Sequence, residues 1–189
     1  MAENMGSMQE NTEEEHSIKL EIYDWMQWIV VALVACILIF TFVGRIIGVD
    51  GSSMVPTLED GDKIIITNIH GELKYGDVVV LTKREFSREP IVKRVIATEG
   101  QTLDINFQTG EVWVDGQLLD EPYINAPTMR QLDVEFPVTV PEGCIFVMGD
   151  NRNKSTDSRA STIGFVDTRC VLGKALNIVY PFSHFGIIK

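Results

Sequence analysis

Residues 77–82 (DVVVLT) and 91–97 (IVKRVIA) decide the fold class, because both are short runs dominated by valine and isoleucine. β-Branched side chains favour strands, and apolar runs of this length bounded by turn residues are typical of buried strands. Gly76 precedes the first run and Pro90 precedes the second. The two runs therefore predict two central strands of a sheet.

The same pattern recurs on both sides of these strands. Five further strands are predicted at KIIIT (63–67), LDINF (103–107), EVWV (111–114), CIFVM (144–148) and CVLGKALNIVY (170–180). Asp115-Gly116 is a strong two-residue hairpin signal, and Gln108-Thr109-Gly110 predicts another turn. No long helical period follows residue 50. The fold class predicted is mostly β: an antiparallel domain, folded or closed on itself, behind one N-terminal transmembrane helix.

That helix is predicted from residues 26–43 (MQWIVVALVACILIFTFV), which contain no charged residue. About 20 apolar residues span the roughly 30 Å of a bilayer core. Trp25 and Trp28 fit an interfacial aromatic belt. A cleaved signal peptide would need a basic segment before the apolar run, and none is present. We therefore predict an uncleaved anchor over 25–46.

Charge divides the chain unevenly. The net charge is -11, and residues 1–24 hold seven acidic residues and one basic residue. We interpret 1–24 as a disordered acidic tail, and 47–189 as the β-rich domain. An acidic chain does not suit nucleic acid as a partner, because phosphate binding needs basic surface. The flanking bases, Lys19 and Arg45, do not decide the orientation of the anchor.

Metal chemistry is not predicted. The histidines and cysteines lack ligand spacing: His16, His70, His184, Cys36, Cys144 and Cys170. We expect no metal and no cofactor. Free thiols and a disulfide between Cys144 and Cys170 both fit the sequence.

Three segments carry candidate chemistry. In GSSMVPTL (51–58), Pro56 restrains the backbone, so a serine there is presented rigidly, although an ordinary serine-rich turn has the same composition. Lys93 lies among apolar strand residues. Burial would lower the pKa of Lys93 and make it a base. Alternatively, a lysine on an edge strand would only keep that strand from pairing wrongly.

The third segment is FVMGDNRNKSTDSR (146–159), a strand that runs into a turn rich in Gly, Asp, Asn and Ser. Asp157 and Arg159 can form a charge-assisted pair, and Ser155 can donate a hydrogen bond to a nearby base. Asp150 or Asp157 as a metal ligand is the alternative.

In this order, these motifs resemble the bacterial type I signal peptidase (leader peptidase) family in its single-span form. The resemblance rests on SMVPTL (53–58), VKRVIA (92–97), GDNRNKSTDSR (149–159), DGQLLDEPY (115–123) and VYPFSHFG (179–186). It implies a serine endopeptidase with a domain of coiled antiparallel sheets. The implied substrates are exported preproteins with Ala-x-Ala type cleavage sites.

The resemblance also implies roles for single residues. Ser53 is the expected nucleophile and Lys93 the general base; Ser155 is expected to hydrogen-bond Lys93, and Asp157 and Arg159 to form a structural ion pair. The expected substrate pockets are lined by Val49, Met54, Leu58, Ile91 and Val92. Gly51 stands where some members carry a serine that helps to hold the oxyanion, so a second oxyanion donor is not identified.

Position along the chain agrees with this interpretation. Ser53 follows Arg45 by eight residues, which reach at most about 26 Å, so it is tethered near the bilayer surface. A signal peptide is cut just past its apolar core. We therefore expect a single-pass protein of the cell membrane near the secretion translocon, with a cytoplasmic N-terminus and an extracytoplasmic catalytic domain.

Three other functions fit part of the sequence. A Ser/Lys autoprotease of the repressor-cleaving kind shares the chemistry, but such proteins are soluble, which the apolar run 26–43 disfavours. An anchored β-domain that only binds a partner, and a pseudoenzyme with an inactive site, are non-catalytic alternatives.

Overall fold

The computed structural model describes residues 21–37, 45–67, 71–83, 87 and 89–188. The chain divides into two units, residues 1–43 and 44–189.

In the first unit, residues 21–37 form a helix with exposed side chains. Among the residues described, no helix is both long enough and apolar enough to span a membrane. Residues 38–44 of the predicted anchor lie outside the described residues, and so do residues 1–20 of the predicted disordered tail. Arg45 and Ile46, which end the predicted anchor, lie in a strand.

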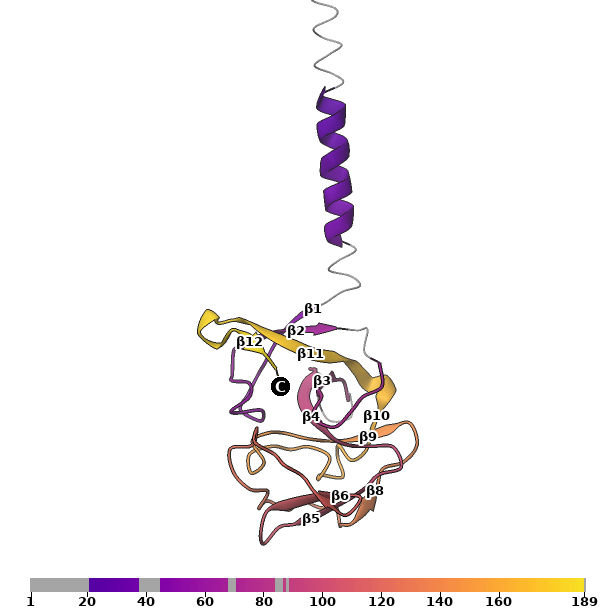
Figure 1. The fold of residues 1–189 in the computed structure, drawn as a ribbon, viewed down its shortest axis with the longest axis vertical. Coiled ribbons are helices and arrows are strands. Elements are labelled where there is room, and N and C mark those ends of the chain that lie inside the picture. Colours follow the sequence, from indigo (N-terminus) through magenta and orange to yellow (C-terminus); the bar gives the residue numbers. More distant parts are fainter. Residues whose placement is uncertain (1–20, 38–44, 68–70, 84–86, 88, 189) are drawn as a thin grey trace, which may run out of the picture. The chain divides into compact units, whose positions relative to one another are not determined.

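The second unit contains two antiparallel sheets (Figure 1). The larger sheet contains β1 (Arg45–Gly48), β2 (Lys63–Thr67), β3 (Val78–Leu81), β4 (Ile91–Thr98), β9 (Cys144–Met148), β10 (Val166–Asp167), β11 (Val171–Tyr180) and β12 (Gly186–Ile187). Its order is β1-β2-β11-β3-β4-β9-β10, and β12 pairs with β11. In Figure 1, β11 is the long strand near the yellow end of the colour scale, and β12 follows it near the C-terminus.

The smaller sheet has the order β7-β6-β5-β8. Its strands are β5 (Thr102–Asn106), β6 (Glu111–Val114), β7 (Gln117–Leu118) and β8 (Val138–Thr139). Asp115 and Gly116 join β6 to β7 with φ angles of 51° and 75°. These are the positive angles that a two-residue hairpin of type I′ needs. The described residues of this unit also form two short 3₁₀ helices, η1 (Thr168–Cys170) and η2 (Phe182–His184).

The core follows from alternation along the strands. In β3, Val78 and Val80 pack into one buried cluster with Ile64, and Val79 and Leu81 pack into a second cluster on the opposite face. Both faces of β3 are therefore covered, which explains why this strand is apolar at every position.

A third cluster joins the two sheets. Leu103 and Ile105 of β5 pack in it with Phe146 and Met148 of β9. Breaks in register of β11 and β4 accompany this arrangement, and such bulges bend strands. The prediction of a mostly β, antiparallel fold is confirmed.

All seven predicted strands are present, with ends that differ by at most one residue. Four strands, β1, β8, β10 and β12, were not predicted from the sequence, and β7 was not predicted as a strand. Four of these five have only two residues, which is too short for alternation to be recognised.

Candidate active site

Ser53 lies in a turn that the core holds on both sides. Its neighbour Met54 is 1% exposed and Leu58 is fully buried, and the Leu58 N–H donates to the Met54 carbonyl at 3.0 Å. The Gly51 N–H donates to Asp60 Oδ1 at 2.7 Å, and the φ of Gly51 is 86°. Ser53 itself is partly exposed. The turn therefore fixes the backbone of Ser53 without burying the residue completely.

Lys93 reaches Ser53 from β4. Its side chain is 4% exposed, and its Nζ lies 2.8 Å from Ser53 Oγ and 3.0 Å from the Val92 carbonyl oxygen. Burial lowers the Lys93 pKa to about 8, although the charges of Asp157 and Asp150 oppose the shift. A fraction of the amine is therefore neutral near physiological pH and lies within hydrogen-bond distance of the hydroxyl.

The loop after β9 closes against the Ser53 turn. The Asn151 N–H donates to the Ser53 carbonyl at 3.0 Å, and Asn151 Nδ2 donates to the Ser52 carbonyl at 2.9 Å. Gly149 has no room for a side chain, because a Cβ there would lie 2.4 Å from the Ser53 carbonyl oxygen. Glycine at 149 is thus what lets two segments nearly 100 residues apart touch.

Asp157 and Arg159 form the predicted ion pair. Arg159 Nε donates to Asp157 Oδ1 at 2.8 Å, Nη2 donates to Oδ2 at 2.8 Å, and both side chains are fully buried. Burial by itself favours the neutral acid, but the Arg159 guanidinium and the Gly149 N–H hold the Asp157 pKa below its ordinary value. Asp157 is therefore a carboxylate near Lys93.

Arg94 and Asp150 form a second buried ion pair, which the sequence analysis missed. Arg94 donates to both carboxylate oxygens of Asp150, at 2.8 and 2.7 Å, and its guanidinium lies 3.9 Å from the centre of the Tyr123 ring. Thr57 also donates to Asp150. An arginine inside an apolar strand signals a buried charge that needs a partner, but the sequence does not name that partner.

A third pair, Arg152 with Glu121, was also missed. Arg152 is fully buried and donates to the two Glu121 oxygens at 2.9 and 2.6 Å. Since Arg159 Nη2 donates to the Arg152 carbonyl at 2.6 Å, the first and third pairs are connected through the backbone of the loop.

Ser155 is placed differently from the prediction. It is fully buried beside Gly149, and its Oγ has no hydrogen-bond partner among the residues described. The structure does not show the predicted hydrogen bond between Ser155 and Lys93: among the described residues, the amine is hydrogen-bonded to Ser53 Oγ and the Val92 carbonyl oxygen.

The five predicted pocket residues do not form one set. Val49, Met54, Leu58 and Val92 pack in a single cluster and are at most 8% exposed. Ile91 packs against a different cluster. Adjacent residues of a strand point to opposite faces, so Ile91 and Val92 face different clusters.

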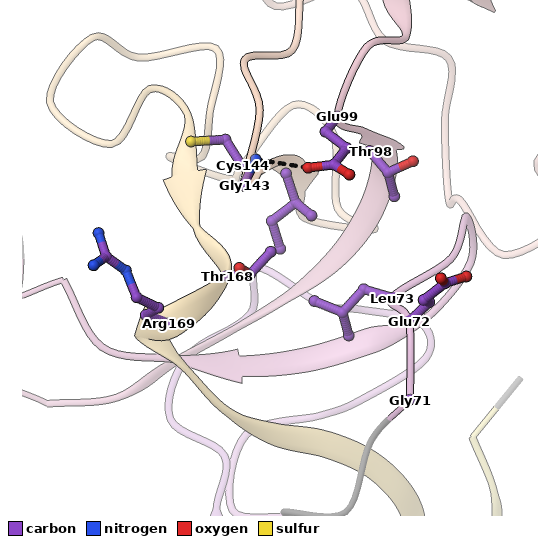
Figure 2. Close-up of a pocket in the computed structure, with 10 residues that line it drawn as sticks. Gly71, Glu72, Leu73, Thr98, Glu99, Gly143, Cys144, Thr168 and Arg169 are labelled. Atoms are coloured by element: carbon purple, nitrogen blue, oxygen red, sulfur yellow. Dashed lines mark hydrogen bonds between the residues drawn. The ribbon is translucent and has the colours of Figure 1, made fainter.

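A cavity of about 640 Å³ lies elsewhere, and neither Ser53 nor Lys93 lines it. Figure 2 shows Glu72, Glu99, Cys144 and Arg169 around it, with the Gly143 N–H donating to Glu99 at 2.7 Å. Cys144 and Cys170 are both free cysteines in the structure.

A serine hydroxyl within hydrogen-bond distance of a buried amine is an arrangement found in serine hydrolases that use lysine as base. The family model described as "Signal peptidase, peptidase S26" matches residues 22–180. The chain belongs to this family, which confirms the resemblance inferred from the motifs, and it is a serine endopeptidase.

The relatives are signal peptidases. Signal peptidase I T of Bacillus subtilis (strain 168) is 35% identical over 194 positions, covering 96% of this chain and 98% of the relative. A probable signal peptidase I-1 of Synechocystis is 37% identical over 168 positions, covering 84% and 82%. A solved signal peptidase I from Enterococcus faecalis V583 is 27% identical, with a TM-score of 0.47, and covers 55% of this chain and 97% of its own.

Proposed function

We propose that this protein is a membrane-bound signal peptidase that cuts exported preproteins with a Ser53/Lys93 dyad. The observation that carries the proposal is the 2.8 Å separation between Lys93 Nζ and Ser53 Oγ, in a site where the amine is 4% exposed. A serine hydroxyl is a weak nucleophile until a base removes its proton, and a desolvated amine is such a base.

In the first half of the reaction, Ser53 Oγ attacks the scissile carbonyl carbon while neutral Lys93 takes the hydroxyl proton. The tetrahedral intermediate collapses, and Lys93 gives that proton to the leaving amine nitrogen. The product is an ester between the substrate acyl group and Ser53. In the second half, Lys93 takes a proton from water, the hydroxide oxygen attacks the ester, and the proton returns to Ser53 Oγ.

The backbone N–H of Ser53 is the proposed donor to the oxyanion. In the described part of the chain, no group accepts a hydrogen bond from it. A donor held ready in this way stabilises the negative charge that develops on the carbonyl oxygen. The Gly51 N–H is already bonded to Asp60, so it is not a ready second donor.

The surrounding residues are proposed to hold the loop after β9 in place and to select the side chains of the substrate. Asp157 and Arg159 keep the loop in place, and Ser155 packs beneath it. Val49, Met54, Leu58 and Val92 offer apolar walls that suit small side chains, as an Ala-x-Ala site requires.

The location is proposed from the sequence. The uncharged run 26–43 is taken as a single-pass anchor in the cell membrane, with the N-terminus in the cytoplasm. The catalytic domain then lies on the extracytoplasmic face near the translocon, where cleavage sites emerge.

Cleavage of a preprotein with an Ala-x-Ala site tests the proposal. We expect the wild type and Ser52→Ala to cut, and Ser53→Ala and Lys93→Met to lose activity. Ser52→Ala is the matched control, because the same substitution is made one residue away. Unimpaired cutting by Ser53→Ala would end the assignment.

A further inference from the structure

Asn151 holds both peptide groups that flank the Ser53 Cα. Its backbone N–H donates to the Ser53 carbonyl at 3.0 Å, and its side-chain Nδ2 donates to the Ser52 carbonyl at 2.9 Å. Rotation of these two peptide groups about the Cα of Ser53 is what would move its Cβ and Oγ. One residue thus restrains the direction of the hydroxyl.

The bond to the Ser52 carbonyl has a second consequence. The Ser52 carbonyl and the Ser53 N–H belong to the same peptide group, and this peptide is trans. In a trans peptide the C=O and N–H point in opposite directions, so the Ser53 N–H points away from Asn151. A hydrogen bond to a carbonyl polarises the N–H of the same group, because linked hydrogen bonds strengthen one another.

The orientation of the Asn151 amide is fixed as well. Asn125 Nδ2 donates to Asn151 Oδ1 at 3.1 Å, which leaves Asn151 Nδ2 directed at the Ser52 carbonyl. Asn151 is 5% exposed, so water does not readily take its place.

We propose that Asn151 is a positioning residue that aims and polarises the Ser53 N–H at the oxyanion of the transition state. The inference rests on the function proposed above, because it assumes that Ser53 is the nucleophile. Asn125 supports Asn151 from the loop before it and acts one step further from the reaction.

The test compares Asn151→Leu with Asn153→Leu in the full chain. Leucine keeps the branching of asparagine at Cγ but has no donor. Asn153 belongs to the same loop, and its Nδ2 likewise donates to a backbone carbonyl, that of Pro127, at 3.0 Å. It also accepts from Met129 and Arg130 N–H groups, so the control loses at least as many hydrogen bonds.

With the Ala-x-Ala preprotein, we expect Asn151→Leu to lower kcat about 10- to 100-fold and to leave KM within about threefold, since a full oxyanion donor contributes about 10²- to 10³-fold. Asn153→Leu should keep both constants within about threefold. A peptide aldehyde ending in Ala-x-Ala supplies a second readout. Ser53 Oγ adds to its carbonyl carbon, and the hydroxyl proton passes to the new hemiacetal oxygen, which faces the Ser53 N–H. Its inhibition constant should rise with Asn151→Leu by about the factor lost in kcat.

Asn125→Ala is a second variant at an exposed position, so folding should not be affected. It should lower kcat by about two- to fivefold, the effect of one lost hydrogen bond. The inference is overturned if Asn151→Leu behaves like Asn153→Leu, or if its loss appears only in KM or in the unfolding temperature. It also falls if aldehyde inhibition is unchanged. If the wild type does not cut, or Ser53→Ala cuts, the proposed function fails first and this inference fails with it.

Discussion

The buried arginines and the buried lysine of this domain have different hydrogen-bond partners. Arg94, Arg152 and Arg159 each donate two hydrogen bonds to one carboxylate and are at most 1% exposed. Lys93 is also buried, but among the residues described its Nζ meets only a hydroxyl and a backbone carbonyl oxygen. The three arginines lie in fixed charge pairs, while among the described residues no carboxylate oxygen lies within hydrogen-bond distance of the lysine amine.

This difference separates the residues that stabilise the fold from the residue that is proposed to act as base. Guanidinium groups stay protonated and suit bidentate pairing, so the arginines can fix the loop after β9 at any working pH. An ammonium without an anionic partner loses its proton more easily when it is desolvated. The arginines therefore stabilise the loop after β9, and Lys93 is the candidate base.

The largest loss of activity is expected when Lys93 is replaced by a residue that stays protonated. Lys93→Arg should lower kcat for the preprotein by about 10³- to 10⁴-fold, because a guanidinium cannot accept the Ser53 proton. Steady-state cleavage rates measure the loss. Lys174→Arg is the control, since Lys174 pairs with Asp77 in a half-exposed site and should keep its activity. Cutting by Lys93→Arg within tenfold of the wild type would show that deprotonation of residue 93 is not needed.

The next largest effect is a loss of stability, expected when one of the paired arginines is replaced. Arg159→Met should lower the free energy of unfolding by about 3–5 kcal/mol, because it leaves Asp157 charged and buried without a partner. Urea unfolding at neutral pH measures this change.

The chain offers a matched control in Asp167 and Arg169, which have the same spacing and the same pair of contacts but lie at the surface, with Arg169 89% exposed. Arg169→Met should leave the unfolding midpoint unchanged, since surface pairs contribute little. Equal losses in the two variants would refute the view that burial makes the first pair important.

The smallest effect is a pH dependence. Since Lys93 must be neutral to act as base and its pKa is lowered to about 8, kcat/KM should rise about tenfold per pH unit below 8 and level off above it. A pH series from 6 to 10 at constant ionic strength checks this. A rate that is flat across the series would mean that another group is the base.

Stability should change with pH through the same lysine. Because the folded pKa lies below the ordinary value of 10.5, the unfolded chain binds one more proton between about pH 8 and 10.5, so this group adds stability as pH rises through that window. Below pH 8 the folded and the unfolded chain both hold this proton, so the full free-energy cost of burying the charged amine remains.

The sequence predicted features that depend on near neighbours. Alternation and β-branched residues located β2, β3 and β4, and the Asp115-Gly116 pair located the hairpin after β6, because side-chain period and turn geometry are set within a few residues. Asp157 and Arg159 were also predicted, since they are two positions apart.

The sequence also determined the candidate dyad, because the motifs around Ser53 and Lys93 resemble one family in their order along the chain. Only the tertiary structure decided what surrounds the dyad. The pairing of Arg94 with Asp150, the contact of Asn151 with the Ser52 carbonyl and the placement of Ser155 join segments up to 99 residues apart. Such contacts depend on which strands are neighbours in the sheet and where each loop closes, and no local pattern in the chain specifies either.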